Sequence, residues 1–400
     1  MKIKKTISQN QKKKLLVNKE SLISAIYYQI TGALLCLAIL FYLSGGKNYI
    51  KLYKELNKVI DTYDTITKNN YSKVDKKDLT DVAINAMLES VEDKYTNYSD
   101  EEETNTFIQN VEGYYEGIGI TVKTDKNGKI IIITVFDNSP AKEAGLKAND
   151  IITKINGEDL TGKTSNDLVD YIKDNKNKKI KLTVLRNEQE KEITITTNKV
   201  TVPTVSSKII DEENKIGYIK ITIFSSVTET QFKKELESLE KKKINALIID
   251  VRNNSGGYLN VVTNISSIFL TKGKVIYQLQ DDSKTTKIKD KTSEKRTYPV
   301  AIVTNRASAS ASEILAGAMK ESYNAIVVGT NTYGKGTVQK TKKLQDGSMI
   351  KYTIEKWLTP SGKWIEEVGI SPTEYIEYDS SKNTDNQIDK TIELLKEKIQ

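Results

Sequence analysis

The sequence of 400 residues contains no histidine, the side chain that most often serves as a general base near neutral pH. A Ser-His-Asp triad and a zinc site with imidazole ligands are therefore excluded. The single cysteine, Cys36, also excludes an intramolecular disulfide bond and a zinc site built from several cysteines. A serine hydroxyl is a weak nucleophile that needs a neighbouring base. A serine enzyme with this composition would need a lysine in that role.

The chain also lacks a large excess of charge of one sign. It has 61 basic and 53 acidic residues, a net charge of +8, and its lysines and glutamates are interspersed through most of its length. This pattern is typical of a solvated surface, and no basic motif interleaved with aromatic residues is present, so we expect no nucleic-acid partner. The length suggests two or three domains and is ample for a buried core.

The N-terminus combines a basic tail with a long uncharged run. Residues 2–19 contain seven lysines and no acid, and residues 22–43 contain no charge. About 20 apolar helical residues span a bilayer core, and lysines stay on the cytoplasmic side. We therefore predict a cytoplasmic tail over 1–21, a transmembrane signal-anchor over 22–43, and an extracytoplasmic remainder. The alternative is a cleaved signal peptide, but its apolar region is typically shorter and no Ala-x-Ala-like site closes this one.

Residues 44–110 are polar and are predicted to form a helical N-terminal domain. Apolar residues recur at helical spacing from Leu79 to Met87, and Asp78 or Thr80 is a candidate cap for that helix. The acidic run at residues 101–103 indicates the solvated start of another helix rather than a metal site. Packing or spacing is the simplest role for this domain.

Residues 111–200 change to short strands and glycine turns. The characteristic series is Gly117-Ile-Gly-Ile120, Ser139-Pro-Ala141, Ala144-Gly-Leu146, Asp150-Ile-Ile152 and Ile155-Asn-Gly157. This series resembles a PDZ domain of the permuted type found in bacterial proteases. In such domains the backbone N–H groups of a glycine-rich loop bind a free C-terminal carboxylate, and the peptide adds as a strand to the sheet edge. The resemblance implies a peptide site at Tyr115, Gly117, Ile118, Gly119 and Ile120; the alternative is a tight turn without a ligand.

Residues 201–400 alternate strands and helices and end in a helix. Apolar strands are predicted at 215–224, 244–251, 300–304 and 325–328, and helices at 229–242, 258–270 and 311–321. Such alternation favours a layered α/β core. We expect the chemistry in the loops at the ends of its strands.

Ser310 directly precedes the helix predicted from Ala311, and Glu313 follows three residues later. This is the pattern of a capping box, in which the serine caps the helix and the glutamate reaches back. A serine at a helix N-terminus also lies where backbone N–H groups and the helix dipole favour a developing negative charge. The small residues Ala307 and Ala309 would let a substrate backbone approach. Both interpretations stay open on these residues alone.

Lys335 stands between Gly334 and Gly336, and a lysine in a surface turn is the ordinary interpretation. A base must be neutral, and an ordinary pKa of about 10.4 leaves less than about 0.1% of the amine neutral at pH 7. Burial can lower the pKa of a lysine by up to about 3–5 units. A catalytic role would therefore require a buried amine. Gln339 would share one face of a strand over 336–344 with Lys335 and could orient the amine by a hydrogen bond.

The run from Gly329 to Lys335 also matches most of a phosphate-binding loop. In that motif a serine or threonine follows the lysine and the loop opens a helix. Here Gly336 follows the lysine, and the next residues have the pattern of a strand. The sequence therefore argues against nucleotide binding.

Three motifs and the PDZ-like segment together resemble the C-terminal (tail-specific) processing peptidases, over about residues 75–400. The motifs are Asp250-Val-Arg-Asn-Asn-Ser-Gly-Gly257, Ser308-Ala-Ser-Ala-Ser-Glu313 and Tyr333-Gly-Lys-Gly-Thr-Val-Gln339, and the similarity begins with Tyr95-Thr-Asn-Tyr98. The resemblance implies Ser310 as nucleophile, Lys335 as general base and Gln339 as the residue that orients the lysine. It implies an oxyanion hole from the N–H of Ala311 and of Gly256 or Gly257. No metal or cofactor is implied.

The resemblance also implies a function and an architecture. We expect an α/β protease core (201–400) with an inserted α+β PDZ domain (111–200), the helical segment (44–110) and one transmembrane helix, in a bacterial cell membrane. The substrates would be proteins outside the membrane that are recognised by their C-terminal tails. The alternative is a catalytically inactive, membrane-tethered PDZ scaffold. Segments 48–110 and 384–400 resemble the parts that relatives use for dimerisation, so a homodimer stays open.

Overall fold

The computed structural model describes residues 9–43, 49–176, 178–293 and 296–399. It divides into two compact units, the first ending at Ile84 and the second beginning at Asn85. Each unit is described by itself. The predicted cytoplasmic tail falls partly outside the described residues, which begin at residue 9.

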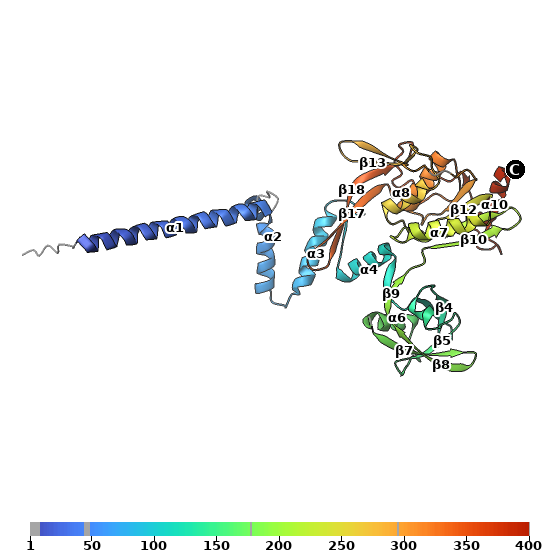
Figure 1. Cartoon of the computed structure of the whole chain (residues 1–400), viewed down its shortest axis with the longest axis horizontal. Helices are drawn as coiled ribbons and strands as arrows, with labels where there is room; N and C mark the ends of the chain where they lie inside the picture. Colours follow the sequence, from blue (N-terminus) through green and yellow to red (C-terminus); the bar gives the residue numbers. More distant parts are fainter. Residues whose placement is uncertain (1–8, 44–48, 177, 294–295, 400) are drawn as a thin grey trace, which may run out of the picture. The chain divides into compact units, whose positions relative to one another are not determined.

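The first unit is helical, as the sequence predicts. Its helices are α1 (Gln9–Leu43), α2 (Tyr49–Asn69) and α3 (Lys76–Glu89), of which α3 continues into the second unit (Figure 1). The segment Ser21–Ile39 of α1 is long and apolar enough to cross a membrane, and none of it is buried. The cap predicted for α3 is wrong, because the helix begins earlier: the Asp75 carboxylate accepts from the N–H groups of Lys77 and Asp78.

The second unit opens with a short strand and a helix. Strand β1 (Asn97–Ser99) pairs with β18 (Met349–Leu358), although the sequence predicts only helix here. Helix α4 (Glu101–Glu112) begins as predicted, and the Asp100 side chain accepts from the N–H of Glu103. It ends at Gly113, whose φ of 71° allows the chain to turn into the next segment.

The PDZ-like segment has a sheet and a hydrophobic core of its own. A two-stranded ladder of β2 (Tyr114–Gly117) and β9 (Asn198–Thr201) joins its ends. Its sheet has the strand order β3-β4-β5-β7-β8, with β6 paired to β5. The strands are β3 (Ile120–Thr124), β4 (Ile130–Val135), β5 (Ile151–Ile155), β6 (Glu158–Asp159), β7 (Lys179–Arg186) and β8 (Gln189–Thr196), and the helices are α5 (Pro140–Glu143) and α6 (Ser165–Asp174). Leu168 of α6 and Ile132 of β4 are fully buried in its core.

The second core is built on a six-stranded sheet of order β10-β11-β12-β15-β16-β19, parallel except for β10 (Figure 1). The strands are β10 (Val205–Asp211), β11 (Ile216–Ile221), β12 (Ala246–Asp250), β15 (Val300–Thr304), β16 (Ile326–Gly329) and β19 (Glu374–Tyr375). Because side chains alternate across a strand, Leu247 and Ile249 enter one hydrophobic cluster and Ala246 and Ile248 another. The sheet is therefore buried on both faces, as expected of a layered α/β core.

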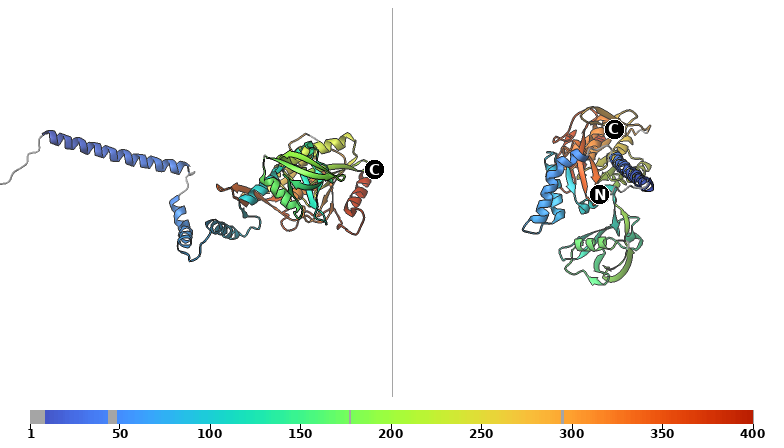
Figure 2. Two further views of the ribbon diagram at one scale, coloured as in Figure 1. Left: turned by 90° about the horizontal axis from the view of Figure 1, so that it is seen from below. Right: turned by 90° about the vertical axis from the view of Figure 1, so that its left-hand side faces the viewer.

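Helices cover both faces of this sheet. The cluster on one face includes residues of α7 (Thr228–Lys241), α8 (Leu259–Ser267) and α9 (Ala311–Ala318), and α9 continues into the π-helical turn η1 (Met319–Tyr323). The cluster on the other face includes α10 (Asn386–Ile399). Figure 2 (left) shows α10, drawn in red, along the outside of the core.

A second sheet, which the sequence does not predict as a sheet, completes the core. Its strand order is β1-β18-β13-β14, and β17 also pairs with β18. The strands not yet given are β13 (Val275–Gln280), β14 (Thr285–Lys289) and β17 (Thr337–Lys343). The loops that follow β12, β15 and β16 leave the same, carboxyl-terminal edge of the parallel sheet, which is where α/β folds place their functional residues.

Candidate active site

Ser310 lies in the loop that follows β15, directly before α9. Its backbone has φ 54° and ψ −112°, a left-handed conformation that is rare for a residue with a side chain. Such conformations persist only where the surroundings enforce them, and they are concentrated at functional sites. Here the N–H of Ala309 donates to the carbonyl oxygen of Asn254 at 3.0 Å, and the Ser312 hydroxyl donates to the same oxygen at 2.8 Å. The glycine turn after β12 therefore fixes the serine.

The Glu313 carboxylate joins the serine loop to the lysine loop. Its Oε2 accepts from the N–H of Ser310 at 2.8 Å and of Lys335 at 2.9 Å. Its Oε1 accepts from the N–H of Gly334 and the hydroxyl of Thr332, both at 2.6 Å. The side chain is fully buried, and burial raises the pKa of its carboxyl while the four donors oppose that change. The carboxylate half of the predicted capping box is thus present, and the same carboxylate also holds the second loop.

Lys335 lies in the loop between β16 and β17, with its amine partly buried. Burial and the nearby positive charge of Lys351 lower the pKa of its amine to about 8, although Glu313, Glu366 and Asp93 act in the opposite direction. A pKa of about 8 leaves roughly a tenth of the amine neutral at pH 7. The lysine is thereby able to accept a proton near neutral pH.

The glycines beside Lys335 permit close backbone packing. A Cβ on Gly334 would lie 2.8 Å from the carbonyl carbon of Glu367, and one on Gly336 would lie 2.6 Å from Nε1 of Trp364. Trp357 Nε1 donates to the carbonyl oxygen of Lys335 at 2.7 Å. The loop is therefore held from two sides, which fixes where the lysine side chain begins.

Gln339 does not make the hydrogen bond to Lys335 that the sequence suggests. Its Nε2 donates to Thr337 Oγ1 at 2.8 Å and to Thr353 Oγ1 at 3.3 Å, and among the described residues no bond joins it to the lysine. The argument from strand alternation fails because Lys335 precedes β17 and a bulge lies between Val338 and Gln339. The two side chains nevertheless line the same groove.

Backbone N–H groups suited to an oxyanion hole lie next to Ser310. A Cβ on Gly256 would be 2.9 Å from Ser310 Cβ and 3.1 Å from the nitrogen of Ala311, so the glycine turn contacts the serine directly. The Gly256 N–H is already bound to Asn254 Oδ1 at 2.9 Å. The N–H groups of Gly257 and Ala311 have no acceptor within the described parts of the chain. The geometry thus favours Gly257 over Gly256.

One groove of about 1290 Å³ is lined by the serine, the lysine and the candidate oxyanion-hole residues. The predicted site residues that line it are Ser310, Lys335, Gln339, Ala311, Gly256 and Gly257. Its apolar wall includes Ile314 and Trp357. The structure therefore brings together every protease-site residue that the sequence suggests.

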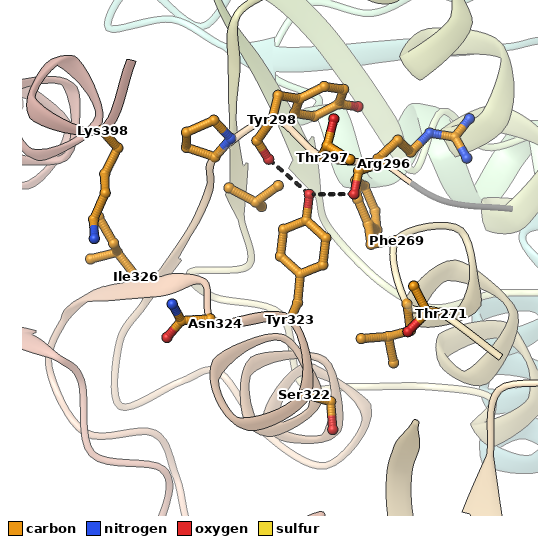
Figure 3. Close-up of a pocket in the computed structure, with 13 residues that line it drawn as sticks. Phe269, Thr271, Arg296, Thr297, Tyr298, Ser322, Tyr323, Asn324, Ile326 and Lys398 are labelled. Atoms are coloured by element: carbon orange, nitrogen blue, oxygen red, sulfur yellow. Dashed lines mark hydrogen bonds between the residues drawn. The ribbon is translucent and has the colours of Figure 1, made fainter. Parts of the chain in front are cut away.

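A smaller cavity of about 390 Å³ lies elsewhere in the core, and Figure 3 shows it. Tyr323 stands at its centre and donates to the carbonyl oxygens of Arg296 and Tyr298. Its lining contains none of the residues predicted for the protease site. The chemistry is therefore assigned to the larger groove.

The predicted peptide-binding loop follows β2. The carbonyl oxygens of Ile118 and Gly119 accept from Ala141 and Phe136 of the same domain. Because C=O and N–H point in opposite directions in a trans peptide, the N–H groups of Gly119 and Ile120 face away from those partners. A Cβ on Gly119 would lie 2.3 Å from that of Ser139, so glycine is required. Tyr115 lies on β2, where its ring packs against Gly117.

Sequence reasoning missed one residue at this site, Tyr95. Its ring centre lies 4.8 Å from Lys335 Nζ, and its hydroxyl donates to Glu366 Oε1 at 3.0 Å. The only signal was the short stretch Tyr95-Thr-Asn-Tyr98 at the start of the family resemblance. The stretch gives no indication of a contact with the lysine.

A doubly covered α/β core, a serine at a helix N-terminus and neighbouring N–H groups without an acceptor among the described residues are the arrangement expected of a serine-type hydrolase. Comparison with known protein families also indicates a peptidase. The model for Peptidase family S41 matches residues 215–396, that for a PDZ domain matches 117–197, and that for the Activating protease CtpB N-terminal domain matches 43–104.

Two curated relatives show to which group within this peptidase family the chain is similar. Carboxy-terminal processing protease CtpB of Bacillus subtilis (strain 168) is 40% identical over 324 residues, which cover 80% of this chain and 67% of that protein. Carboxy-terminal processing protease CtpA of the same strain is 37% identical over 322 residues, covering 80% and 68%. A solved structure described as an S41 protease of Bacteroides fragilis NCTC 9343 shares the fold at 15% identity, with a TM-score of 0.52 and coverage of 78% and 90%. The chain belongs to the carboxy-terminal processing proteases of peptidase family S41 and is a serine peptidase.

Proposed function

We propose that this serine peptidase is anchored in a bacterial cell membrane by residues 22–43 and cleaves extracytoplasmic proteins with a Ser310–Lys335 pair. The observation that carries the catalytic assignment is the shared groove, in which the lysine has a pKa of about 8. The anchor is supported by the unburied apolar segment Ser21–Ile39 and by the lysines before it. The proposed division is a tail (1–21), the anchor, a helical domain (44–110), a PDZ domain (111–200) and the protease core (201–400).

The proposed reaction is acyl transfer. Neutral Lys335 accepts the proton of the Ser310 hydroxyl as its oxygen attacks the scissile carbonyl, and the resulting oxyanion is bound by the N–H groups of Ala311 and Gly257. The C–N bond then breaks, and the lysine ammonium returns the proton to the leaving amine. Water hydrolyses the acyl-enzyme, with the lysine again as the base. Gln339 is bonded to Thr337 and Thr353 instead of to the amine, and it lines the same groove as the lysine.

We further propose that the PDZ domain selects substrates by their C-terminal carboxylate. The inward-facing carbonyls of Ile118 and Gly119 support this assignment, because they turn the next N–H groups toward the exposed side of the loop. The exposed sheet edge at β3 would receive the peptide as an added strand. Protein tails rather than small molecules would then be the substrates.

The experiment measures kcat/KM against pH for the full chain in detergent, with an unstructured peptide carrying a free C-terminus. The rate should rise about tenfold per pH unit below pH 8 and level off above it, since the neutral fraction of Lys335 controls it. Ser310→Ala and Lys335→Ala should abolish cleavage. The same peptide with an amidated C-terminus should show a raised KM.

Two results would count against the proposal. Equal activity in the wild type and both variants would remove the Ser-Lys assignment, and a rate that keeps rising past pH 10 would mean that the lysine keeps its ordinary pKa. Tail binding without any cleavage by the wild type would instead indicate the scaffold alternative.

A further inference from the structure

The segment between α3 and β1 covers the proposed catalytic base. Tyr95 presents the face of its ring to Lys335 Nζ, 4.8 Å from the ring centre. This tyrosine lies within the match to the N-terminal domain model (43–104), and the lysine lies within the peptidase match (215–396). An aromatic contact of the lysine amine is therefore supplied from outside the peptidase-family match.

The ring is held in place by a carboxylate that also binds the lysine loop. Glu366 Oε1 accepts from the Tyr95 hydroxyl at 3.0 Å, and Glu366 Oε2 accepts from the N–H of Gly336 at 2.7 Å. Lys94 forms an ion pair with the same carboxylate at 2.9 Å. Burial and Glu366 raise the pKa of the tyrosine to about 12, so its hydroxyl stays protonated and donates. The ring and the residue after Lys335 thus share one anchor.

A ring over an amine has two opposing effects. It excludes water, which disfavours the ammonium form, and its face attracts a cation, which favours that form. The charged groups that face the amine are Lys351, which disfavours the ammonium, and Glu313, Glu366 and Asp93, which favour it. The pKa of Lys335 is nevertheless lowered, with burial as the largest cause. Burial of the amine, to which the Tyr95 ring contributes at 4.8 Å, therefore acts together with Lys351 to outweigh the three carboxylates.

We propose that Tyr95 is a positioning residue of the peptidase reaction, whose ring shields the Lys335 amine from water and holds it in the groove. The inference rests on the proposed Ser310–Lys335 mechanism. It gives the N-terminal domain a part in the chemistry in addition to packing or spacing.

The test compares three variants of the full chain in detergent by kcat/KM against pH. Tyr95→Ala removes the shield, and Tyr95→Gln replaces it with a polar side chain. Both should move the apparent pKa upward by about one unit or more, so that the rate at pH 7 falls about tenfold and the deficit shrinks toward pH 10. Tyr95→Phe keeps the ring but loses the bond to Glu366 that holds it, so its midpoint should shift less than that of Tyr95→Ala.

A second readout does not depend on cleavage. In the Ser310→Ala chain, the pH dependence of Lys335 acetylation by acetic anhydride, measured by peptide mass spectrometry, reports the pKa of the amine directly. The midpoint should rise when Tyr95→Ala or Tyr95→Gln is added. An unchanged or lowered midpoint in a variant with an intact thermal transition would overturn the inference. Failure of Lys335→Ala to affect cleavage would instead reject the mechanism and leave the acetylation result to decide the shielding.

Discussion

Replacing Glu313 by glutamine would test whether one carboxylate holds both halves of the catalytic site. The change preserves shape but exchanges one oxygen for an NH₂ group. At present each oxygen accepts two bonds, from the N–H groups of Ser310 and Lys335 on one side and from Gly334 and Thr332 on the other. In either orientation of the amide, the NH₂ group would face donors instead of accepting from them.

The magnitude follows from these bonds. A hydrogen bond to a charged group contributes about 1.5–3 kcal/mol, and about two of the four would be lost, so the free energy of unfolding should fall by about 3–6 kcal/mol. That is a large part of the total stability of an ordinary domain. The negative charge of Glu313 raises the pKa of Lys335. Its removal should therefore lower the midpoint of the pH–rate profile while kcat/KM on the plateau also falls.

The chain has two tryptophans, Trp357 and Trp364, and both donate to carbonyl oxygens of the lysine loop. Tryptophan fluorescence during urea unfolding therefore reports on this region. Glu321→Gln is the matched control, because that carboxylate accepts one N–H, from Ser361, at an exposed position. The Glu321→Gln change should lower the free energy of unfolding by less than about 1 kcal/mol. An unchanged unfolding midpoint in Glu313→Gln, or an upward shift of its pH–rate profile, would refute the reasoning.

Two further substitutions test the oxyanion loop and the PDZ domain. Gly257→Ala would place a Cβ 2.2 Å from the carbonyl oxygen of Phe224 at φ 140°, so kcat/KM should fall about 100-fold or more. Gly128→Ala is the control, because it adds the same methyl group at another positive φ (76°) but with no atom within 4 Å; it should leave the rate unchanged. Asp150→Ala would leave Arg186 without its buried partner at 2.6 Å and should cost about 3–5 kcal/mol, seen as lost amide protection in the PDZ sheet. Burial raises the pKa of Asp150, but Arg186 and Lys147 together more than offset this and the net pKa is lowered. The stabilisation is therefore present above about pH 4 and is lost as the pH falls further. Unaltered amide protection would contradict the second prediction.

The sequence is most informative about the fold where burial is complete. Strand β15 (Val300–Thr304) was predicted with its observed bounds because every residue is apolar or small and both faces are covered. Strands β17 and β18 are different, since exposed lysines and threonines interrupt their pattern. These two strands form a local hairpin, but the pairing of β18 with β13 and with β1 joins segments far apart in the chain.

In the site, too, the sequence predicts the residues in local motifs but not the contacts between distant segments. Ser310 and Lys335 were identified because each lies in a short local motif, whereas the contact of Tyr95 spans the whole unit. Its hydroxyl bonds a residue 271 positions away. Gln339 bonds Thr337 and Thr353 instead of Lys335 because a bulge interrupts the strand before it. A bulge has no dependable signature in a single sequence.

The left-handed backbone of Ser310 also bears on how this enzyme could change over time. Holding a non-glycine residue in such a conformation costs on the order of 1–3 kcal/mol, which the surrounding bonds must offset. Glycine would adopt the same torsions without that cost but has no hydroxyl. Selection for stability alone would thus favour glycine at position 310 and an inactive protein. Only selection for hydrolysis keeps a serine at this position.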